Sequence, residues 1–196
     1  MKLVHSAAFA VFLCCFAAGS LQAATAEELQ AEARSAIQTL NKAIQEKNDP
    51  MRNRMYFKFR LIEQDHPGIV APILIENLKS DIAGVPEYTA FILGWIEDPR
   101  AIAPLREMLK GNDEFKKAAA KALGNMKAKD AIPDLIALLS DTNPRIREQA
   151  AYGLGLIGDD SANEALQKLT QDPDELVQFF AKEALERIEN LKKYGW

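Results

Sequence analysis

Few groups of side chains in this sequence have the spacing that acid–base catalysis or metal binding would need. His66 stands in the turn-like segment DHPG, and no later histidine is present to complete a usual metal site. Two acidic segments, Asp159-Asp160 and residues 172–175, could bind a cation or transfer protons. Acidic residues at these places are also typical of helix N-termini, and this is the interpretation we favour. We therefore expect no catalytic residue, no metal site and no cofactor.

Aromatic side chains at helical spacing are stronger candidates for binding. Several of them stand two positions before a recurring leucine or close by, and lysines join them near the middle of the chain. Aromatic residues with neighbouring charges dominate protein interfaces, so we expect a protein partner to bind them, whereas the alternative is that the rings only pack against adjacent helices. The predicted binding residues are Tyr56, Phe59, Tyr88, Phe91, Lys117, Lys121 and Tyr152.

A basic run accompanies the first of these aromatic residues. It consists of Arg52, Arg54, Lys58 and Arg60. Such a run is usually the solvated face of a helix, and binding of an anionic ligand is the alternative.

Residues 1–23 are predicted to be an export signal. Lys2 precedes an apolar run of 12 residues, 7–18, which is shorter than the roughly 20 residues that span a bilayer. Small Ala23 is a plausible cleavage point, although an uncleaved anchor is the weaker alternative. Both cysteines and His5 lie in this segment, so the chain from Ala24 has no thiol. We expect a periplasmic or secreted protein with no membrane span after cleavage.

The charge of the predicted mature chain argues against nucleic acid as a partner. Removal of Lys2 from the 24 basic residues leaves 23 against 28 acidic residues, a net charge of −5. Nucleic acids and anionic lipids are bound by basic surfaces, so a general affinity for either is not expected.

A Leu-Gly pair recurs along the chain and marks an internal repeat. It begins at Leu93, Leu123 and Leu154, spaced by 30 and 31 residues, and each copy is followed by a similar segment. Related segments also surround Pro67 and residues 184–188, which makes five units with diverged outer copies. A period of this length is typical of a helical repeat array.

Each unit is predicted to contain two short helices. In the second one, apolar residues recur at helical spacing up to the landmark leucine, as in Ile146, Ala150 and Leu154. Glycine in a helix interior costs about 1 kcal/mol relative to alanine, so a close contact must require it. We expect the first helix of the next unit to cross at Gly94, Gly124 and Gly155.

The ends of the array are predicted to differ from its middle. Residues 24–65 are expected to form a diverged N-terminal helix pair, in which TAEE at 25–28 is a capping box. The repeat array with its C-terminal cap is expected over residues 66–196.

These repeats resemble the HEAT repeat superfamily, and in their short period the HEAT-like repeats of the phycobilisome-lyase type. The resemblance covers residues 66–190 and is carried best by segment 138–166, with Asp141, Arg147, an alanine pair and the Leu-Gly step. It implies an all-α, right-handed α-α superhelix of about five helix pairs. It also implies a ladder in which an aspartate and a basic residue support each other, but Gln178 and Lys110 interrupt that pattern here.

The resemblance leaves the activity open, because one fold serves many functions. We expect an exported, non-catalytic module that presents a concave helical surface to another protein, either as a binding module or as a structural subunit of a cell-envelope complex. The alternative is an enzyme or small-ligand carrier similar to the bilin lyases. Some HEAT-repeat hydroxylases bind iron through His-Glu pairs, but Pro67 follows the single candidate His66 here.

Overall fold

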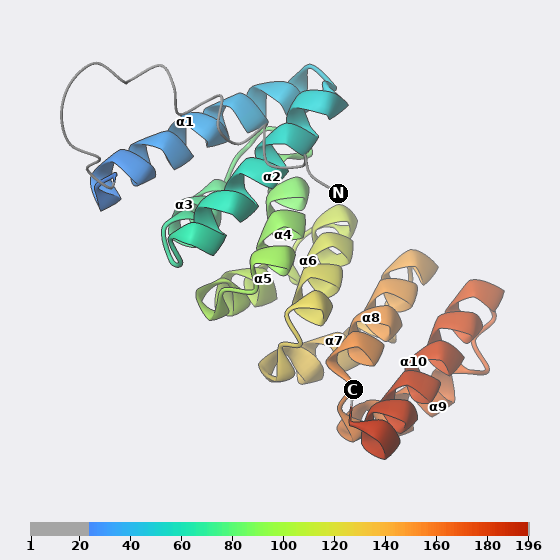
Figure 1. Cartoon of the computed structure of the whole chain (residues 1–196). Coiled ribbons are helices and arrows are strands. Elements are labelled where there is room, and N and C mark those ends of the chain that lie inside the picture. The colour runs from blue at the N-terminus through green and yellow to red at the C-terminus, as the bar shows by residue number, and fades with distance from the viewer. Residues whose placement is uncertain (1–23, 196) are drawn as a thin grey trace, which may run out of the picture.

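The computed structural model describes residues 24–195, so the predicted export signal, 1–23, and Trp196 lie outside the described residues. The described part contains ten α-helices arranged as five successive pairs (Figure 1). The pairs are α1 (Ala26–Gln45) with α2 (Asp49–Asp65), α3 (Val70–Asn77) with α4 (Val85–Ile96), α5 (Ile102–Met108) with α6 (Asp113–Asn125), α7 (Ile132–Leu138) with α8 (Pro144–Ile157), and α9 (Asn163–Leu169) with α10 (Glu175–Tyr194). Short 3-10 helices at Pro99–Ala101, Lys129–Ala131 and Asp160–Ala162 lead into α5, α7 and α9.

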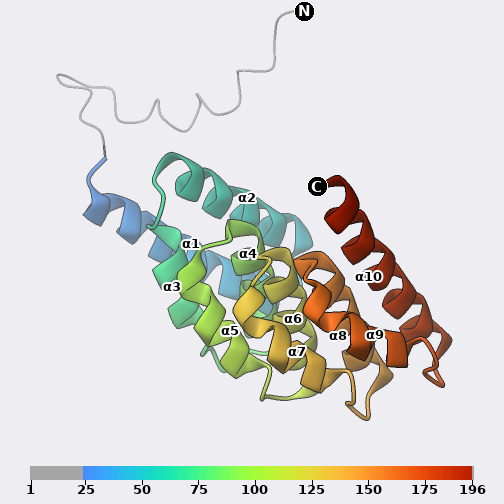
Figure 2. The same cartoon turned by 90° about the horizontal axis from the view of Figure 1, so that it is seen from below.

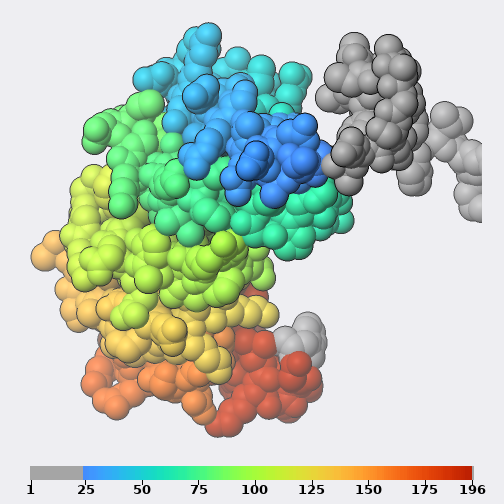
Figure 3. Space-filling model, turned by 90° about the vertical axis from the view of Figure 1, so that its left-hand side faces the viewer, coloured from blue at the N-terminus to red at the C-terminus, as the bar shows by residue number. Residues whose placement is uncertain are grey.

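The pairs stack into a curved, two-layered array. The second helices, α2, α4, α6, α8 and α10, form one layer, and the shorter first helices of the later pairs lie behind them (Figures 1 and 2). The space-filling view shows a hollow on the side of the second helices, between the N-terminal pair and α10 (Figure 3). This architecture confirms the predicted all-α solenoid of about five helix pairs.

The predicted apolar stripes form the core of the array. In α8, Ile146, Ala150 and Leu154 are all buried, as the helical spacing indicates. The capping box at the start of α1 is also present, because Thr25 accepts a hydrogen bond from the Glu28 N–H and the Glu28 carboxylate accepts one from the Thr25 N–H. These local signals fix where the helices begin and which side of each helix is covered.

The landmark glycines lie at equivalent contacts, but not with the helices that the sequence suggested. A Cβ added at Gly94, Gly124 or Gly155 would lie 2.9, 2.7 or 2.8 Å from the Cα of Ala122, Gly153 or Ala184, respectively. These three partners belong to the next unit's second helix, so the expectation that its first helix crosses here is wrong. The second helices touch backbone to backbone because each one packs directly against the next, α4 on α6, α6 on α8 and α8 on α10.

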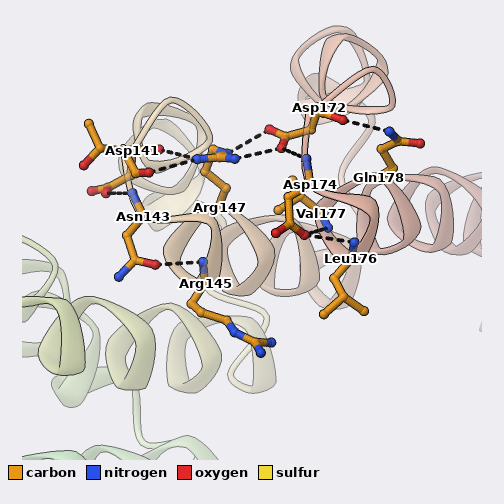
Figure 4. Close-up of polar contacts among 10 residues, drawn as sticks. Asp141, Asn143, Arg145, Arg147, Asp172, Asp174, Leu176, Val177 and Gln178 are labelled. Atoms are coloured by element: carbon orange, nitrogen blue, oxygen red, sulfur yellow. Dashed lines mark hydrogen bonds and ion pairs between the residues drawn. The ribbon is translucent and has the colours of Figure 1, made fainter.

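Charged side chains link successive repeats on the loop side of the array. Lys116 donates to the Asp141 carboxylate (2.8 Å), and Arg147 makes a two-pronged contact with Asp172 (2.7 and 2.8 Å; Figure 4). Both pairs join residues 25 positions apart. Each aspartate is therefore neutralised by the preceding repeat, whereas the residue six positions later in its own repeat, Arg147 or Gln178, bonds its backbone carbonyl.

The interruptions predicted for this ladder differ in their consequences. Arg147 donates to the carbonyl oxygen of Asp141 (2.9 Å), and Gln178 donates in the same way to the carbonyl oxygen of Asp172 (2.7 Å; Figure 4). Gln178 therefore preserves the backbone contact without a charge. Lys110 instead pairs with Glu107 on its own unit (2.7 Å), so the ladder does not continue in that direction.

Across residues 24–195, no helix is both long enough and apolar enough to cross a membrane.

Candidate functional site

An aromatic cluster, formed by Tyr56, Phe57, Tyr88, Phe91 and Trp95, bridges α2 and α4. The ring centroids of Phe91 lie 5.7 Å from Tyr56, 5.6 Å from Tyr88 and 6.3 Å from Trp95, and Phe57 lies 5.2 Å from Tyr56. The α4 members stand at helical spacing, so α4 presents one ring per turn. Phe91 connects the rings of the two helices.

The aromatic cluster is partly open to solvent. Phe57 is 63% exposed and Trp95 is 48% exposed, whereas Tyr56, Tyr88 and Phe91 are half-buried. The cause is the position of α2, which packs mainly against α1 and touches α4 little. The rings therefore fill the seam between α2 and α4 and leave aromatic surface accessible to a ligand.

Two guanidinium groups lie against the aromatic cluster. The Cζ atom of Arg52 is 4.8 Å from the ring centroid of Tyr88, and that of Arg60 is 5.8 Å from the ring centroid of Tyr56. Both distances are within the range of a cation–π contact. The basic run of α2 is thus divided: Arg52 and Arg60 face the rings, Lys58 pairs with Glu32 of α1 (3.0 Å), and Arg54 is exposed.

Two buried polar atoms beside the aromatic cluster lack hydrogen-bond partners. They are Nε of Arg52 and Oε2 of Glu87, and Glu87 is the neighbour of Tyr88 in α4. Arg52 also contacts Asp49 (3.1 Å) through another nitrogen, so its guanidinium is held in place while Nε stays unsatisfied. In folded proteins, buried polar groups of this kind usually bind ordered water or another polar group.

Burial raises the pKa of the Tyr88 hydroxyl above its ordinary value, although the positive charge of Arg52 opposes the shift. Tyr88 is consequently neutral near pH 7 and can act as a hydrogen-bond donor. The aromatic cluster together with Arg52 and Arg60 thus combines ring faces, a neutral hydroxyl and two positive charges. Such a surface suits a planar, conjugated molecule that carries carboxylates.

Three of the seven predicted binding residues, Tyr56, Tyr88 and Phe91, come together in the aromatic cluster. Phe59 does not, because its side chain is completely buried in the core. Met55, Phe59 and Ile62 form the covered face of α2, so the register of the later repeats does not apply to the diverged first pair. Assigning Phe59 to the binding surface was therefore wrong.

The other predicted residues lie further along the array. Lys117 pairs with Glu114 on α6 (2.7 Å), and Lys121 on the same helix is exposed. Tyr152 on α8 makes an edge-to-face contact with Phe180 of α10, with ring centroids 6.0 Å apart. Phe57 and Trp95 were missed in the sequence, although Trp95 stands seven residues after Tyr88 and so shares its side of α4.

The titratable candidates are used in other ways. His66 is the exposed C-cap residue that follows α2, and Asp174 caps α10 by accepting from the N–H groups of Leu176 and Val177. Asp159 and Asp160 pair with Lys129 (3.2 Å) and Lys192 (3.0 Å). Within residues 24–195, no group of three or more His, Cys, Asp or Glu side chains could hold a metal ion.

Comparison with known proteins places this array among helical repeats. A family model described as HEAT repeats matches residues 71–147 and 110–186. The structure of the complex of CpcE and CpcF of phycocyanin lyase from Nostoc sp. PCC7120 superposes with a TM-score of 0.62 and 22% identity, over 92% of this chain and 71% of that chain. This structural likeness concerns the fold.

Two curated relatives with higher sequence identity are enzymes. Human deoxyhypusine hydroxylase is 33% identical over 108 residues, which are 54% of this chain and 36% of that enzyme. Epoxyqueuosine reductase from Bacillus anthracis is 36% identical over 86 residues, which are 43% of this chain and 23% of that enzyme. The match thus spans only about a third of the length of the hydroxylase and about a quarter of the length of the reductase.

These relatives correct the functional expectation drawn from the sequence. A non-catalytic interaction module or scaffold was expected, and no enzyme. The relatives matched in sequence include a hydroxylase and a reductase, so the expectation is contradicted. The alternative, an enzyme or small-ligand carrier similar to the bilin lyases, agrees better with them.

Proposed function

The chain belongs to the HEAT repeat family, and on that premise we propose that it is an enzyme or carrier of the bilin-lyase type. Its ligand is a planar, conjugated acid of the tetrapyrrole class, bound on the concave face at the aromatic cluster. The observation that carries the proposal is a set of five neighbouring rings on α2 and α4, with Arg52 and Arg60 of α2 against them.

The rings supply the larger part of the binding energy. A flat conjugated ligand covers the exposed surface of Phe57 and Trp95, which are 63% and 48% exposed. Burial of apolar surface is worth about 25 cal/mol per Å², and offset or edge-to-face ring contacts add about 0.5–1.5 kcal/mol each. Phe91 holds the rings together, so it determines the shape of the surface.

The guanidinium groups supply orientation. Carboxylates of the ligand accept hydrogen bonds from the terminal guanidinium nitrogens of Arg52 and Arg60. The neutral hydroxyl of Tyr88 offers one more donor beside Arg52. Because the charges and the rings come from two helices, they hold a ligand in one orientation, which a carrier or an enzyme needs.

Export is part of the proposal. The apolar segment 7–18 after Lys2 supports secretion across a membrane, so the ligand is met in the periplasm or outside the cell. A protein partner also stays within the proposal, since phycocyanin lyase is a complex of two chains.

The test is an absorbance titration of biliverdin, an open-chain tetrapyrrole with two carboxylates, with the purified chain from Ala24. We expect a saturable spectral change at ligand concentrations below about 1 mM. Arg52→Met removes a charge-assisted contact and should weaken binding about tenfold. Arg54→Met removes an exposed charge from the same helix and should change the affinity less than about twofold.

A second variant tests the rings. Phe91→Leu keeps an apolar side chain of similar volume but removes the ring between Tyr56, Tyr88 and Trp95, so it should weaken biliverdin binding about tenfold. Phe179→Leu changes an exposed ring on α10 and is the matched control. The proposed function is wrong if no saturable change occurs. It is also wrong if Arg52→Met and Phe91→Leu both bind biliverdin as tightly as the unmodified chain does.

A further inference from the structure

A second hollow, here named the C-terminal groove, lies on the concave side between α8 and α10. Its walls include Lys127, Tyr152, Leu156, Phe180, Glu183 and Arg187, and its volume is about 560 Å³. Ligand-binding pockets usually have volumes of about 300–1,000 Å³. The helices that line it stand side by side in Figure 1, beyond α6 from the aromatic cluster.

One side of the C-terminal groove is aromatic. Tyr152 and Phe180 meet edge to face with ring centroids 6.0 Å apart, and Leu156 extends the apolar wall along α8. Both rings are half-buried, so each keeps part of its surface open. An aromatic ring is the group that this wall complements best, because a third ring can stack or add edge-on to the pair.

The other side carries opposite charges that are not neutralised. On α10, Phe180, Glu183 and Arg187 recur at spacings of three and four residues, which places them on one face of the helix. A Glu-Arg pair at a spacing of four can form an ion pair. Neither Glu183 nor Arg187, nor Lys127 across the groove, makes an ion pair or side-chain hydrogen bond with any residue in 24–195.

The neighbouring charges outside the groove behave differently. Lys129 pairs with Asp159 (3.2 Å) and Lys192 pairs with Asp160 (3.0 Å) on the same end of the array. The walls of the groove carry charges of both signs, because Glu186 also lines it. A ligand with a single charge would be repelled by a like charge in the groove. Glu183 repels an anion, and Arg187 repels a cation.

We propose that the C-terminal groove binds a small aromatic zwitterion, such as a free aromatic amino acid. The ring contacts Tyr152 and Phe180, the carboxylate is bound by Arg187, and the ammonium group is bound by Glu183. The groove is separate from the aromatic cluster, because α6 with Lys117 and Lys121 lies between them. This site therefore goes beyond the proposed function and does not depend on it.

Calorimetric titration with three probes tests this ligand class. The probes are L-phenylalanine, phenethylamine, which lacks the carboxylate, and 3-phenylpropionate, which lacks the ammonium group. We expect L-phenylalanine to bind saturably and at least about tenfold more tightly than either analogue, since each lost charged contact is worth about 1.5 kcal/mol or more.

Two variants assign the charges to their residues. Arg187→Met should weaken binding of L-phenylalanine and 3-phenylpropionate about tenfold without changing that of phenethylamine, and Glu183→Gln should affect L-phenylalanine and phenethylamine but not 3-phenylpropionate. Both positions are exposed, so folding is preserved and can be checked by circular dichroism.

Arg60→Met is the control, because it alters the aromatic cluster and not the groove. It should leave binding of L-phenylalanine unchanged. The proposal is overturned if L-phenylalanine does not bind saturably, if all three probes bind equally, or if the two groove variants bind L-phenylalanine as the unmodified chain does.

Discussion

Phe57 and Phe59 stand two positions apart on α2 and have opposite surroundings. Phe59 is completely buried against the core, and Phe57 is 63% exposed beside Tyr56. Two positions along a helix correspond to a rotation of about 200°, so Phe57 and Phe59 cannot lie on the same face of α2. At this scale the function of a ring depends on helix register, and the register differs between α2 and the later repeats.

The two phenylalanines give a matched test of that assignment. Phe59→Ala leaves a cavity in the core and should lower the free energy of unfolding by about 3–5 kcal/mol. Phe57→Ala removes exposed surface and should change it by less than about 0.5 kcal/mol. Urea denaturation followed by circular dichroism measures both. Equal losses for the two variants would contradict the position of Phe59 in the core.

How far the site could be predicted also depends on register. Tyr88 and Phe91 were predicted because their side of α4 follows from the landmark Leu93, which the sequence repeats. Phe59 was misplaced because the first pair has no landmark of its own. Trp95 was not predicted because it follows the landmark Leu93, whereas the predicted residues of α4 precede it. The contact of Arg52 with the Tyr88 ring becomes visible only in three dimensions.

The contacts between second helices determine how the elements stack. The sequence predicted a close approach at each landmark glycine, since glycine in a helix is costly. It did not indicate which helix approaches, because the first and second helices of the next unit are both apolar on one side. The structure places Ala122, Gly153 and Ala184 there, all of them small residues of second helices.

Gly155→Ala tests the contact between α8 and α10. The added Cβ would lie 2.8 Å from the Cα of Ala184 and 2.9 Å from its Cβ, so the two helices must separate. We expect a net loss of about 1–3 kcal/mol in unfolding free energy, despite the higher helix propensity of alanine.

Gly195→Ala serves as the comparison, because nothing lies within 4 Å of an added Cβ there. The cost of Gly195→Ala therefore comes only from its left-handed backbone, with φ of 74°, and should be about 1–2 kcal/mol. Differential scanning calorimetry measures the stability of both variants, and crystal structures of the two variants should show α10 displaced only in Gly155→Ala. A Gly155→Ala chain as stable as the unmodified one would exclude the close approach.

The charged ladder makes the junctions between the last three helix pairs sensitive to pH. The Arg147 guanidinium hydrogen-bonded to Asp172 lowers the pKa of that carboxyl, and Lys116 lowers the pKa of Asp141 in the same way. A carboxyl with a depressed pKa in the folded state stabilises the fold fully above its unfolded pKa, about 3.9, and this stabilisation is lost as the pH falls through the folded pKa.

We therefore expect stability to fall as the pH drops below about 4, and Arg147→Met to remove part of that dependence. At pH 7 the same variant leaves Asp172 without its partner, which should cost about 2–3 kcal/mol. Lys168→Met, in the exposed pair with Glu164, should change the stability much less than Arg147→Met does. Unfolding curves at pH 3, 5 and 7 measure the pH dependence of the unfolding free energy. If Arg147→Met leaves this dependence unchanged, the ladder is contradicted.

The whole molecule has one concave face with two chemically different ends. The N-terminal end offers the aromatic cluster with Arg52 and Arg60, and the C-terminal end offers a groove with charges of both signs. The repeat period of the sequence was sufficient to predict the solenoid, because each helix pair needs its neighbours to cover its apolar side. It was not sufficient to predict the activity, since the residues of a site need not follow the period.

Trp95 allows the central claim, ligand binding at the aromatic cluster, to be tested directly. The sequence has two tryptophans, so Trp196→Phe leaves Trp95 as the single fluorescent indole. Trp95 lies at the edge of the aromatic cluster, with its ring centroid 6.3 Å from that of Phe91, and a bound tetrapyrrole would quench its emission. Titration of the Trp196→Phe chain with biliverdin should give saturable quenching at the same concentrations as the absorbance change. Binding without quenching, or no binding, would contradict the account.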